Sequence, residues 1–297
     1  MQVSKIKFEG KNAVELTTAE MRLVGVSDFG PRLAFFGTPG GANLLYWKPG
    51  KHKRGDWDLR GGHRVWVTRP GADECEDTYA PDNGPCEVAV FGNGFCLIGD
   101  RSPLNGTRRG IGVKLLNTHS VQVDSFVIND SNLLYSGGVW GLTCTVPGKG
   151  TTYGIPVGDG SPWDAFTMVS FRKWAGQGQG GYADDQIVMR EDMMVVQPKG
   201  IENKRMIQSH HGIIAMSDPA SGVTFAKKIE CAPVGHYPLN TNIAFYIGPA
   251  NFMVEMETMG PEQTLKPGQD LHHRETWLLH PATTDFSVAA NLTRLFA

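Results

Sequence analysis

The chain has 297 residues, and 40% of them are hydrophobic, which is enough for a sizeable core in one large domain or two average ones. Its 28 Lys and Arg residues nearly balance 30 Asp and Glu residues, so charge provides no attraction to nucleic acid or to an anionic membrane. No apolar run approaches the roughly 18 residues of a membrane-spanning helix. We therefore expect no nucleic-acid partner and no membrane partner.

The N-terminal segment, residues 1–8, lacks the continuous apolar core of a secretion signal. We therefore expect a cytoplasmic protein, and a secreted or periplasmic one only if a signal peptide has been removed. The cysteines are widely spaced, and none belongs to a Cys-x-x-Cys pair: Cys75, Cys86, Cys96, Cys144 and Cys231. This spacing favours free, mostly buried thiols over zinc ligands.

The 37 glycines and 18 prolines separate many short apolar runs, and this pattern is typical of an all-β sandwich or barrel. In chain order, the predicted strands are Lys5–Glu9, Met21–Val26, Arg32–Phe36, Asn43–Trp47, Val65–Thr68, Glu87–Phe91, Val113–Leu116, Val121–Ile128, Asn132–Tyr135, Leu142–Val146, Phe166–Phe171, Val188–Gln197, Gly212–Met216, Val223–Lys228, Asn242–Ile247, Phe252–Thr258 and Glu275–Leu279.

Helix signals are few, and the best one lies at the C-terminus. Thr284 and Asp285 can cap a helix there. Three apolar residues, Val288, Leu292 and Leu295, follow at helical spacing. Many strands, one short helix and no linker predict one giant sandwich over residues 1–297.

The first candidate site lies at Gly61-Gly-His63-Arg64-Val-Trp66, which opens a predicted strand. Alternation places Arg64 and Trp66 on one face and His63 on the other. A guanidinium beside an aromatic ring supplies a fixed fork of donors near an apolar wall, which suits a sugar or a carboxylate. The alternative is a structural Arg64 that pairs with a core carboxylate.

Two further segments could contact a ligand. The turn-rich loop around Asp82 and Asn83 presents polar groups on a stiff backbone, which suits ligand contact. The acidic residues upstream of it favour a solvated loop over a calcium site, because their spacing is not that of an EF-hand. Trp140 follows a Gly-Gly pair, and an aromatic ring beside glycine can form a stacking platform for a sugar. A core tryptophan is the equal alternative for Trp140.

The late strand within residues 251–261 carries two carboxylates. Side chains alternate along a strand, so Glu255 and Glu257 point the same way, roughly 7 Å apart. Two acids on one face are costly to bury without partners. They therefore either lie on a solvated face, pair with Arg or Lys, or line a polar cleft.

Nothing in the sequence indicates a metal or a cofactor. The pairs His210-His211 and His272-His273 are adjacent, and neighbours in a strand point in opposite directions, so neither pair chelates one metal by itself. No Gly-x-Ser-x-Gly elbow is present, and no thiol sits in an activating setting.

Several phrases together resemble a bacterial branch of the galactose mutarotase-like superfamily, which includes the aldose 1-epimerases. The phrases run along nearly the whole chain: Asp28-Phe-Gly-Pro-Arg32-Leu, Asn43-Leu-Leu, Gly61-Gly-His63-Arg64-Val-Trp66, Tyr79-x-Pro81-Asp82-Asn83-Gly-Pro85, Val139-Trp140-Gly-Leu-Thr143, Val254-Glu255-Met-Glu257-Thr-Met-Gly260-Pro261, Leu265-x-Pro267-Gly268-Gln269 and His273-x-Glu275-Thr-Trp277. Their order and spacing are specific for the fold rather than for an activity.

The resemblance implies a β-supersandwich with a sugar cleft across one sheet. Enzymes of that family interconvert sugar anomers with a late-strand Glu as base and a His as acid. Glu255 or Glu257 resembles the base, with Glu257 favoured because it is nearer the Gly-Pro exit. Arg64 resembles a sugar-binding arginine, and Arg32 lies in the matching early strand.

The sequence departs from the family at the acid. Where the enzymes carry an Asn-His-x-Tyr/Phe-x-Asn phrase, this chain has Val139-Trp140-Gly-Leu. His63 could supply the acid from another strand, and His210 or His211 are further candidates.

Three hypotheses follow, and each takes a small or oligomeric carbohydrate as its partner. The first is a mutarotase-like isomerase that uses Glu257. The second is a glycoside hydrolase or a polysaccharide lyase, in which Arg32, Arg64 or Arg69 would neutralise an acidic sugar. The third is a non-catalytic binding domain that stacks sugars on Trp66 and Trp140. Exposed edge strands could pair two copies into a homodimer.

Overall fold

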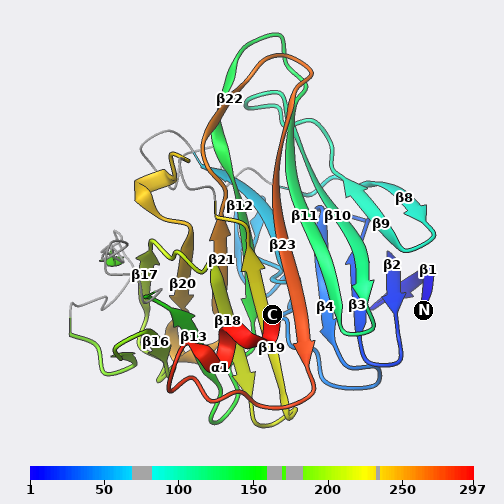
Figure 1. The fold of residues 1–297 in the computed structure, drawn as a ribbon. Helices are drawn as coiled ribbons and strands as arrows, with labels where there is room; N and C mark the ends of the chain where they lie inside the picture. The colour runs from blue at the N-terminus through cyan, green and yellow to red at the C-terminus, as the bar shows by residue number, and fades with distance from the viewer. Residues whose placement is uncertain (69–81, 159–168, 172–182, 232–234) are drawn as a thin grey trace.

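The computed structural model describes residues 1–68, 82–158, 169–171, 183–231 and 235–297. Two large antiparallel sheets lie face to face (Figure 1), as predicted for a β-supersandwich. The first has 11 strands, in the order β1 (Gln2–Phe8), β2 (Lys11–Thr17), β3 (Arg22–Val26), β4 (Arg32–Gly37), β7 (His63–Thr68), β12 (Tyr135–Thr145), β21 (Val254–Met259), β20 (Ile243–Ile247), β17 (Asn203–Ile207) and β14 (Val169–Phe171), with β22 (Gln263–Leu265) paired to β12.

The second sheet has 10 strands, in the order β15 (Ile187–Met189), β16 (Met193–Val196), β13 (Thr152–Pro156), β18 (Ile213–Asp218), β19 (Val223–Ile229), β23 (Asp270–His280), β11 (Ser120–Asn129), β10 (Thr107–Asn117), β9 (Gly94–Ile98) and β8 (Glu87–Phe91). A separate hairpin joins β5 (Lys53–Arg54) to β6 (Trp57–Asp58). All-β architecture is thus confirmed.

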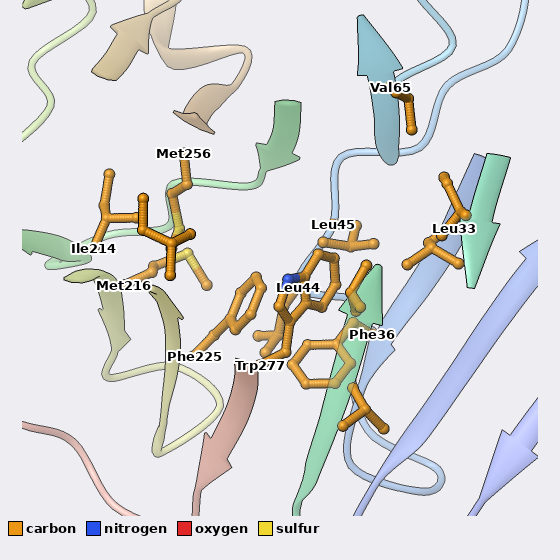
Figure 2. Packing of buried hydrophobic residues seen from close by; sticks show 14 of the residues in the cluster. Leu33, Phe36, Leu44, Leu45, Val65, Ile214, Met216, Phe225, Met256 and Trp277 are labelled. Carbon is orange, nitrogen blue, oxygen red and sulfur yellow. The ribbon is translucent and has the colours of Figure 1, made fainter. Parts of the chain in front are cut away.

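The main core lies between the two sheets. Alternate residues of the paired strands point into it, so that Phe36 of the first sheet meets Phe225 and Trp277 of the second (Figure 2). The Trp277 ring lies 5.3 Å from Phe36 and 5.0 Å from Phe225, measured between ring centroids. This packing fixes which face of each strand is left to point outward.

The C-terminal helix packs on one part of the outer face of the second sheet, near β18 and β19, as Figure 1 shows. Helix α1 spans Ala290–Thr293 and continues as a 3-10 turn, Arg294–Phe296, so it is shorter than the predicted pattern. Leu292 is fully buried in a cluster that includes residues of β16, β18 and β19, whereas Val288 is 45% exposed. The outer face of the first sheet has a different composition, because it carries the charged side chains described below.

Two predicted strands are wrong. Residues 43–47 form only isolated bridges, from Leu45 to Thr145 and from Trp47 to Gly61. Residues 132–134 form a bend instead, because the Asn129 side chain donates a 2.8 Å hydrogen bond to the Leu133 carbonyl and closes a turn there.

Other boundaries moved or were missed. The predicted strand Val188–Gln197 divides into β15 and β16, with a 2.7 Å hydrogen bond from Arg190 N–H to the Met193 carbonyl across the turn. The first part of the predicted strand Phe166–Phe171 lies outside the described residues. Sequence patterning missed β2, β5, β6, β9, β13, β17 and β22.

Among the described residues, no helix is long and apolar enough to cross a membrane. Cys86, Cys96, Cys144 and Cys231 are free thiols, and Cys75 lies outside the described residues. Burial raises the pKa of the Cys96 thiol to about 11 and that of Cys86 to about 12. These thiols are therefore protonated near neutral pH.

Candidate functional site

Outward-facing side chains at the centre of the first sheet form a charged cluster with two side chains from adjoining loops. The sheet contributes Arg32, Arg64, Lys204, Glu255 and Glu257, and the loops contribute Arg60 and Asp82. The strand register brings its members together, because Arg32 of β4 pairs with Arg64 of β7, and both Arg64 and Glu257 pair with Leu142 of β12. Lys204 of β17 completes the row on the far side of β20. The six neighbouring strands from β4 to β17 thus bring together charged residues that lie far apart in the sequence.

At one end of the cluster, two arginines hold the predicted polar loop. Arg32 Nη2 lies 2.6 Å from Asp82 Oδ2, and Arg60 Nη1 lies 3.1 Å from Asp82 Oδ1. Arg60 also donates to the side-chain oxygen of Asn83. Burial lowers the pKa of Arg32 to about 10, while Asp82 opposes that shift. Asp82 and Asn83 therefore reach the charged cluster, whereas Tyr79, Pro81 and Arg69 lie outside the described residues.

Arg64 occupies the centre of the cluster. Its guanidinium carbon lies 3.9 Å from the Trp66 ring centroid and 5.7 Å from that of Trp57, and its Nη2 lies 3.3 Å from Glu255 Oε1. The predicted shared face of Arg64 and Trp66 is confirmed. Arg64 Nε and Nη1 are buried and have no hydrogen-bond partner among the described residues. The Arg64 guanidinium thus pairs with Glu255 through one nitrogen, while two of its other N–H groups stay unsatisfied among the described residues.

At the other end, Glu257 is fully buried and paired. Its Oε2 atom lies 3.1 Å from Lys204 Nζ and accepts a 3.0 Å hydrogen bond from Trp140 Nε1. The ammonium of Lys204 also lies 4.7 Å from the Trp140 ring centroid. Trp140 is 0% exposed, so in this structure it serves as a core tryptophan that orients Glu257 rather than as an open stacking platform.

His63 is on the opposite side of the sheet from Glu257. Its Nδ1 lies 2.9 Å from Thr143 Oγ1 and its Nε2 lies 3.1 Å from Ser125 Oγ, both between the two sheets. Burial lowers the pKa of His63 to about 3, which keeps the imidazole neutral. The structure therefore does not bring His63 together with the proposed base, because residues 63 and 64 of one strand face opposite ways.

The other histidine candidates lie elsewhere. His210 is exposed in the turn that follows β17, and the His211 ring contacts the Gly158 carbonyl oxygen. Neither of these positions belongs to the charged cluster. In the described part of the chain, no group of three or more His, Cys, Asp and Glu side chains is placed to hold a metal ion.

A second polar network, between the sheets, was missed from the sequence. Lys227 Nζ lies 2.8 Å from Glu275 Oε1, and Glu275 Oε2 accepts a 2.6 Å hydrogen bond from Trp277 Nε1. Burial raises the pKa of Glu275, but Lys227 and the nearby histidines lower it further, to about 2. The signal was present in the alternation, because Lys227 follows Val223 and Phe225 on the inward face.

Half-buried aromatic side chains lie between the charged cluster and solvent. Trp57 of the small hairpin packs against the apolar group that contains Trp66 and Trp140. Tyr246, which pairs with both Glu255 and Lys204 across neighbouring strands, donates a hydrogen bond to Glu202. This aromatic border is a surface on which a sugar ring could stack.

His52 lies at the same border. Its Nε2 is 2.9 Å from the Tyr46 hydroxyl, and its ring centroid is 4.7 Å from that of Phe252. Tyr46 in turn packs with Cys144, whose thiol contacts Glu255 Oε1 at 3.4 Å. His52 therefore lies near the Glu255 end of the cluster, although its sequence context gave no sign of it.

No family model matches the sequence, and no curated protein resembles it. Solved structures do resemble its fold. A candidate aldose 1-epimerase from Escherichia coli K12 is 14% identical with a TM-score of 0.61, and the match covers 90% of this chain and 98% of that one. A galactose mutarotase-like protein from Lactobacillus casei is 10% identical with a TM-score of 0.59, over 90% of this chain and 100% of the other.

A galactose mutarotase-like protein from Clostridium acetobutylicum is also 10% identical, with a TM-score of 0.57 over 94% of this chain and 98% of that one. At such identities, the likeness concerns the arrangement of strands and leaves the chemistry open. The sequence resemblance and the structural likeness agree on that arrangement. The chain therefore has the galactose mutarotase-like fold.

Proposed function

We propose that the protein binds a carbohydrate at the charged cluster and interconverts its anomers. One observation carries the proposal: Arg64 keeps two buried N–H groups without hydrogen-bond partners among the described residues, beside the Glu255 carboxylate and the Trp66 ring. A buried donor left unsatisfied costs about 1–3 kcal/mol, so such a group calls for a ligand or another explanation. Sugar hydroxyls supply acceptors of the required kind.

Glu257 is the proposed base. Anomer interconversion begins when a base removes the proton of the anomeric hydroxyl, and a carboxylate held in place by Lys204 and Trp140 has the fixed orientation that this step needs. Glu255, which faces the same way, is engaged with Arg64. It would help to position the sugar.

Access to Glu257 requires a local rearrangement, because Glu257 is 0% exposed and Lys204 is 4% exposed. Trp57 packs over this region from a hairpin whose two strands contain only two residues each. Such a hairpin is marginally stable by itself, so it can move at little cost. We propose that sugar binding displaces Trp57 from the Trp66 and Trp140 rings.

The test is a measurement of anomer exchange by NMR for a panel of free and phosphorylated aldoses. Wild-type protein should accelerate exchange of at least one sugar, and Glu257→Gln should lower that rate by roughly 10²- to 10⁴-fold, the usual contribution of a general base. Glu15→Gln is a matched control, since Glu15 pairs with Arg22 on the surface of the same sheet. Absence of any acceleration across the panel would refute the proposed activity.

A second candidate function is sugar binding without turnover. The position of His63 favours it, because the histidine that the family's reaction would use is not on the face of the charged cluster. Titration of the protein with sugars, followed by tryptophan fluorescence, separates the two functions. Saturable binding together with an unchanged anomer exchange rate would establish the binding module.

A further inference from the structure

Among the described residues, no histidine of the central strands of the first sheet lies on the outward face beside Glu257. The described strands β4, β7, β12, β21, β20 and β17 contain one histidine, His63, and it points between the sheets. Ring opening nevertheless needs two proton transfers, one from the anomeric hydroxyl and one to the ring oxygen. Within the described part of this face, the proton donor must therefore be a side chain other than histidine.

We infer that Lys204 is this proton donor and that Lys204 and Glu257 act as one bifunctional acid–base pair, an inference that rests on the proposed function. Lys204 Nζ lies 3.1 Å from Glu257 Oε2, and both groups are held by Trp140, which contacts the ammonium with its ring and the carboxylate with its N–H group. The anomeric and ring oxygens of an aldose are bonded to the same carbon. Two adjacent groups of opposite charge therefore match two adjacent oxygens.

The proton and electron balance of the step is complete. The anomeric O–H proton goes to a Glu257 carboxylate oxygen, and the electron pair of that bond forms the carbonyl double bond. The bond between the anomeric carbon and the ring oxygen breaks, and its electron pair stays on the ring oxygen, which takes a proton from Lys204. The products are the open-chain aldehyde, a protonated Glu257 and a neutral Lys204. Rotation of the carbonyl and the reverse transfers close the ring as the other anomer.

Burial favours this exchange. Desolvation disfavours charged groups, so converting a buried ion pair to a neutral pair requires less reorganisation than creating a single new charge would. A lysine ammonium carries three protons and can transfer one of them to the ring oxygen. Arginine at the same position would keep the positive charge but would not give up a proton.

Tyr246 is the strongest competing donor on this face. It pairs with Lys204 and with Glu255 across neighbouring strands, but its hydroxyl donates its hydrogen bond to Glu202. Burial and the neighbouring Glu202 raise the pKa of Tyr246, which makes the phenol a weaker acid. Tyr246→Phe therefore makes the matched comparison for variants of Lys204.

The experiment measures kcat and KM for anomer exchange in the wild-type protein, Lys204→Arg, Lys204→Gln and Tyr246→Phe. We expect both Lys204 variants to lose roughly 10²- to 10⁴-fold in kcat, with Lys204→Arg close to wild type in KM and in thermal midpoint. Tyr246→Phe should reduce kcat far less than either Lys204 variant does. Lys199→Arg, measured in the same way, is the control that should keep the wild-type kcat, because Lys199 pairs with Asp185 on the surface. If Lys204 were purely structural, Lys204→Arg would keep the wild-type kcat. A loss of kcat with unchanged KM and thermal midpoint therefore identifies a chemical role.

Combining Lys204→Arg with Glu257→Gln should cost little more than either change alone, since the two side chains act as a unit. A folded Lys204→Arg or Lys204→Gln with wild-type kcat would overturn the inference while leaving the proposed function intact, provided that Glu257→Gln is inactive. A wild-type protein that accelerates no anomer exchange would instead remove the proposed function itself, and the inference with it.

Discussion

At the scale of single residues, Arg64 combines a structural contact with unused donor capacity. Its side chain is 2% exposed, and the guanidinium lies against Trp66 and contacts Glu255 through one nitrogen. Nε and Nη1 have no hydrogen-bond partner among the described residues. A planar guanidinium has five donors in a fixed fork, which an ammonium cannot reproduce. The predicted role of Arg64 therefore depends on the shape of its head group as well as on its charge.

Arg64→Lys should weaken sugar binding by roughly 10- to 100-fold, because hydrogen bonds to a charged donor contribute about 1.5–3 kcal/mol. The charge facing Glu255 is kept, so the free energy of unfolding should change much less than the binding free energy. The measurement is a fluorescence titration with the sugar that binds wild-type protein best. Arg22→Lys provides the control, because Arg22 forms a partly exposed ion pair with Glu15 on the same sheet. Unchanged affinity in Arg64→Lys would exclude the fork as the sugar contact.

At the scale of elements, the start of β7 depends on two glycines. Gly61 and Gly62 have φ values of +87° and +73°, in the left-handed region that favours glycine. Gly62 N–H donates a 2.6 Å hydrogen bond to the Tyr46 carbonyl, and a Cβ atom on Gly62 would overlap the Leu33 carbonyl oxygen. The hydrogen bond holds Tyr46 beside the start of β7, two residues before Arg64.

Gly62→Ala should therefore lower the free energy of unfolding by about 3 kcal/mol or more, since backbone overlap adds to the left-handed strain. Gly40→Ala is the matched control, because Gly40 has the same φ of +73° but no atom within 4 Å of the place that a Cβ atom would take. Strain alone should cost it about 1 kcal/mol. Chemical denaturation measures both values, and equal losses in the two variants would contradict the proposed close approach.

At the scale of the whole molecule, the buried network between the sheets joins both layers. His63 of the first sheet and His273 of the second both lie near the Lys227–Glu275 pair, and His273 Nε2 is 2.8 Å from Thr258 Oγ1. Burial lowers the pKa of His63 to about 3 and that of His273 to about 4, from an ordinary value of 6.5. Both imidazoles are therefore neutral in the folded protein over most of the acid range.

These shifts predict that stability falls with acidity. Above pH about 6.5, neither state binds a proton at these histidines; between about 6.5 and 4, the unfolded state binds two that the folded state does not. The free energy of unfolding should then fall by up to about 2.7 kcal/mol per pH unit, because each of the two protons contributes about 1.36 kcal/mol per pH unit. Below pH about 4.5, Glu275 adds a loss of the same sign.

Urea denaturation between pH 7.5 and 4.5 measures this slope. The difference between wild type and the double variant His63→Gln with His273→Gln isolates the histidine contribution, because other titrating groups are common to both. We expect the double variant to be less stable at pH 7.5 but to lose less stability on acidification. Parallel slopes for the two proteins would show that the histidines are not the cause.

The sequence by itself determined the class of fold and the local orientation of side chains. The side-chain period of a strand is two residues, so the shared face of Arg64 with Trp66, and of Glu255 with Glu257, followed from spacing alone. Those pairs are confirmed by their contacts in the charged cluster.

Only the tertiary structure decided which strands are neighbours. Lys204 lies on β17 and reaches Glu257 across β20. The local sequence of β17, Asn203-Lys-Arg-Met-Ile207, did not predict a strand. The outward direction of Glu257 and the inward direction of His63 likewise depend on which face the second sheet covers. Pairing between distant strands and burial of one face are long-range contacts, and alternation along a single strand does not carry that information.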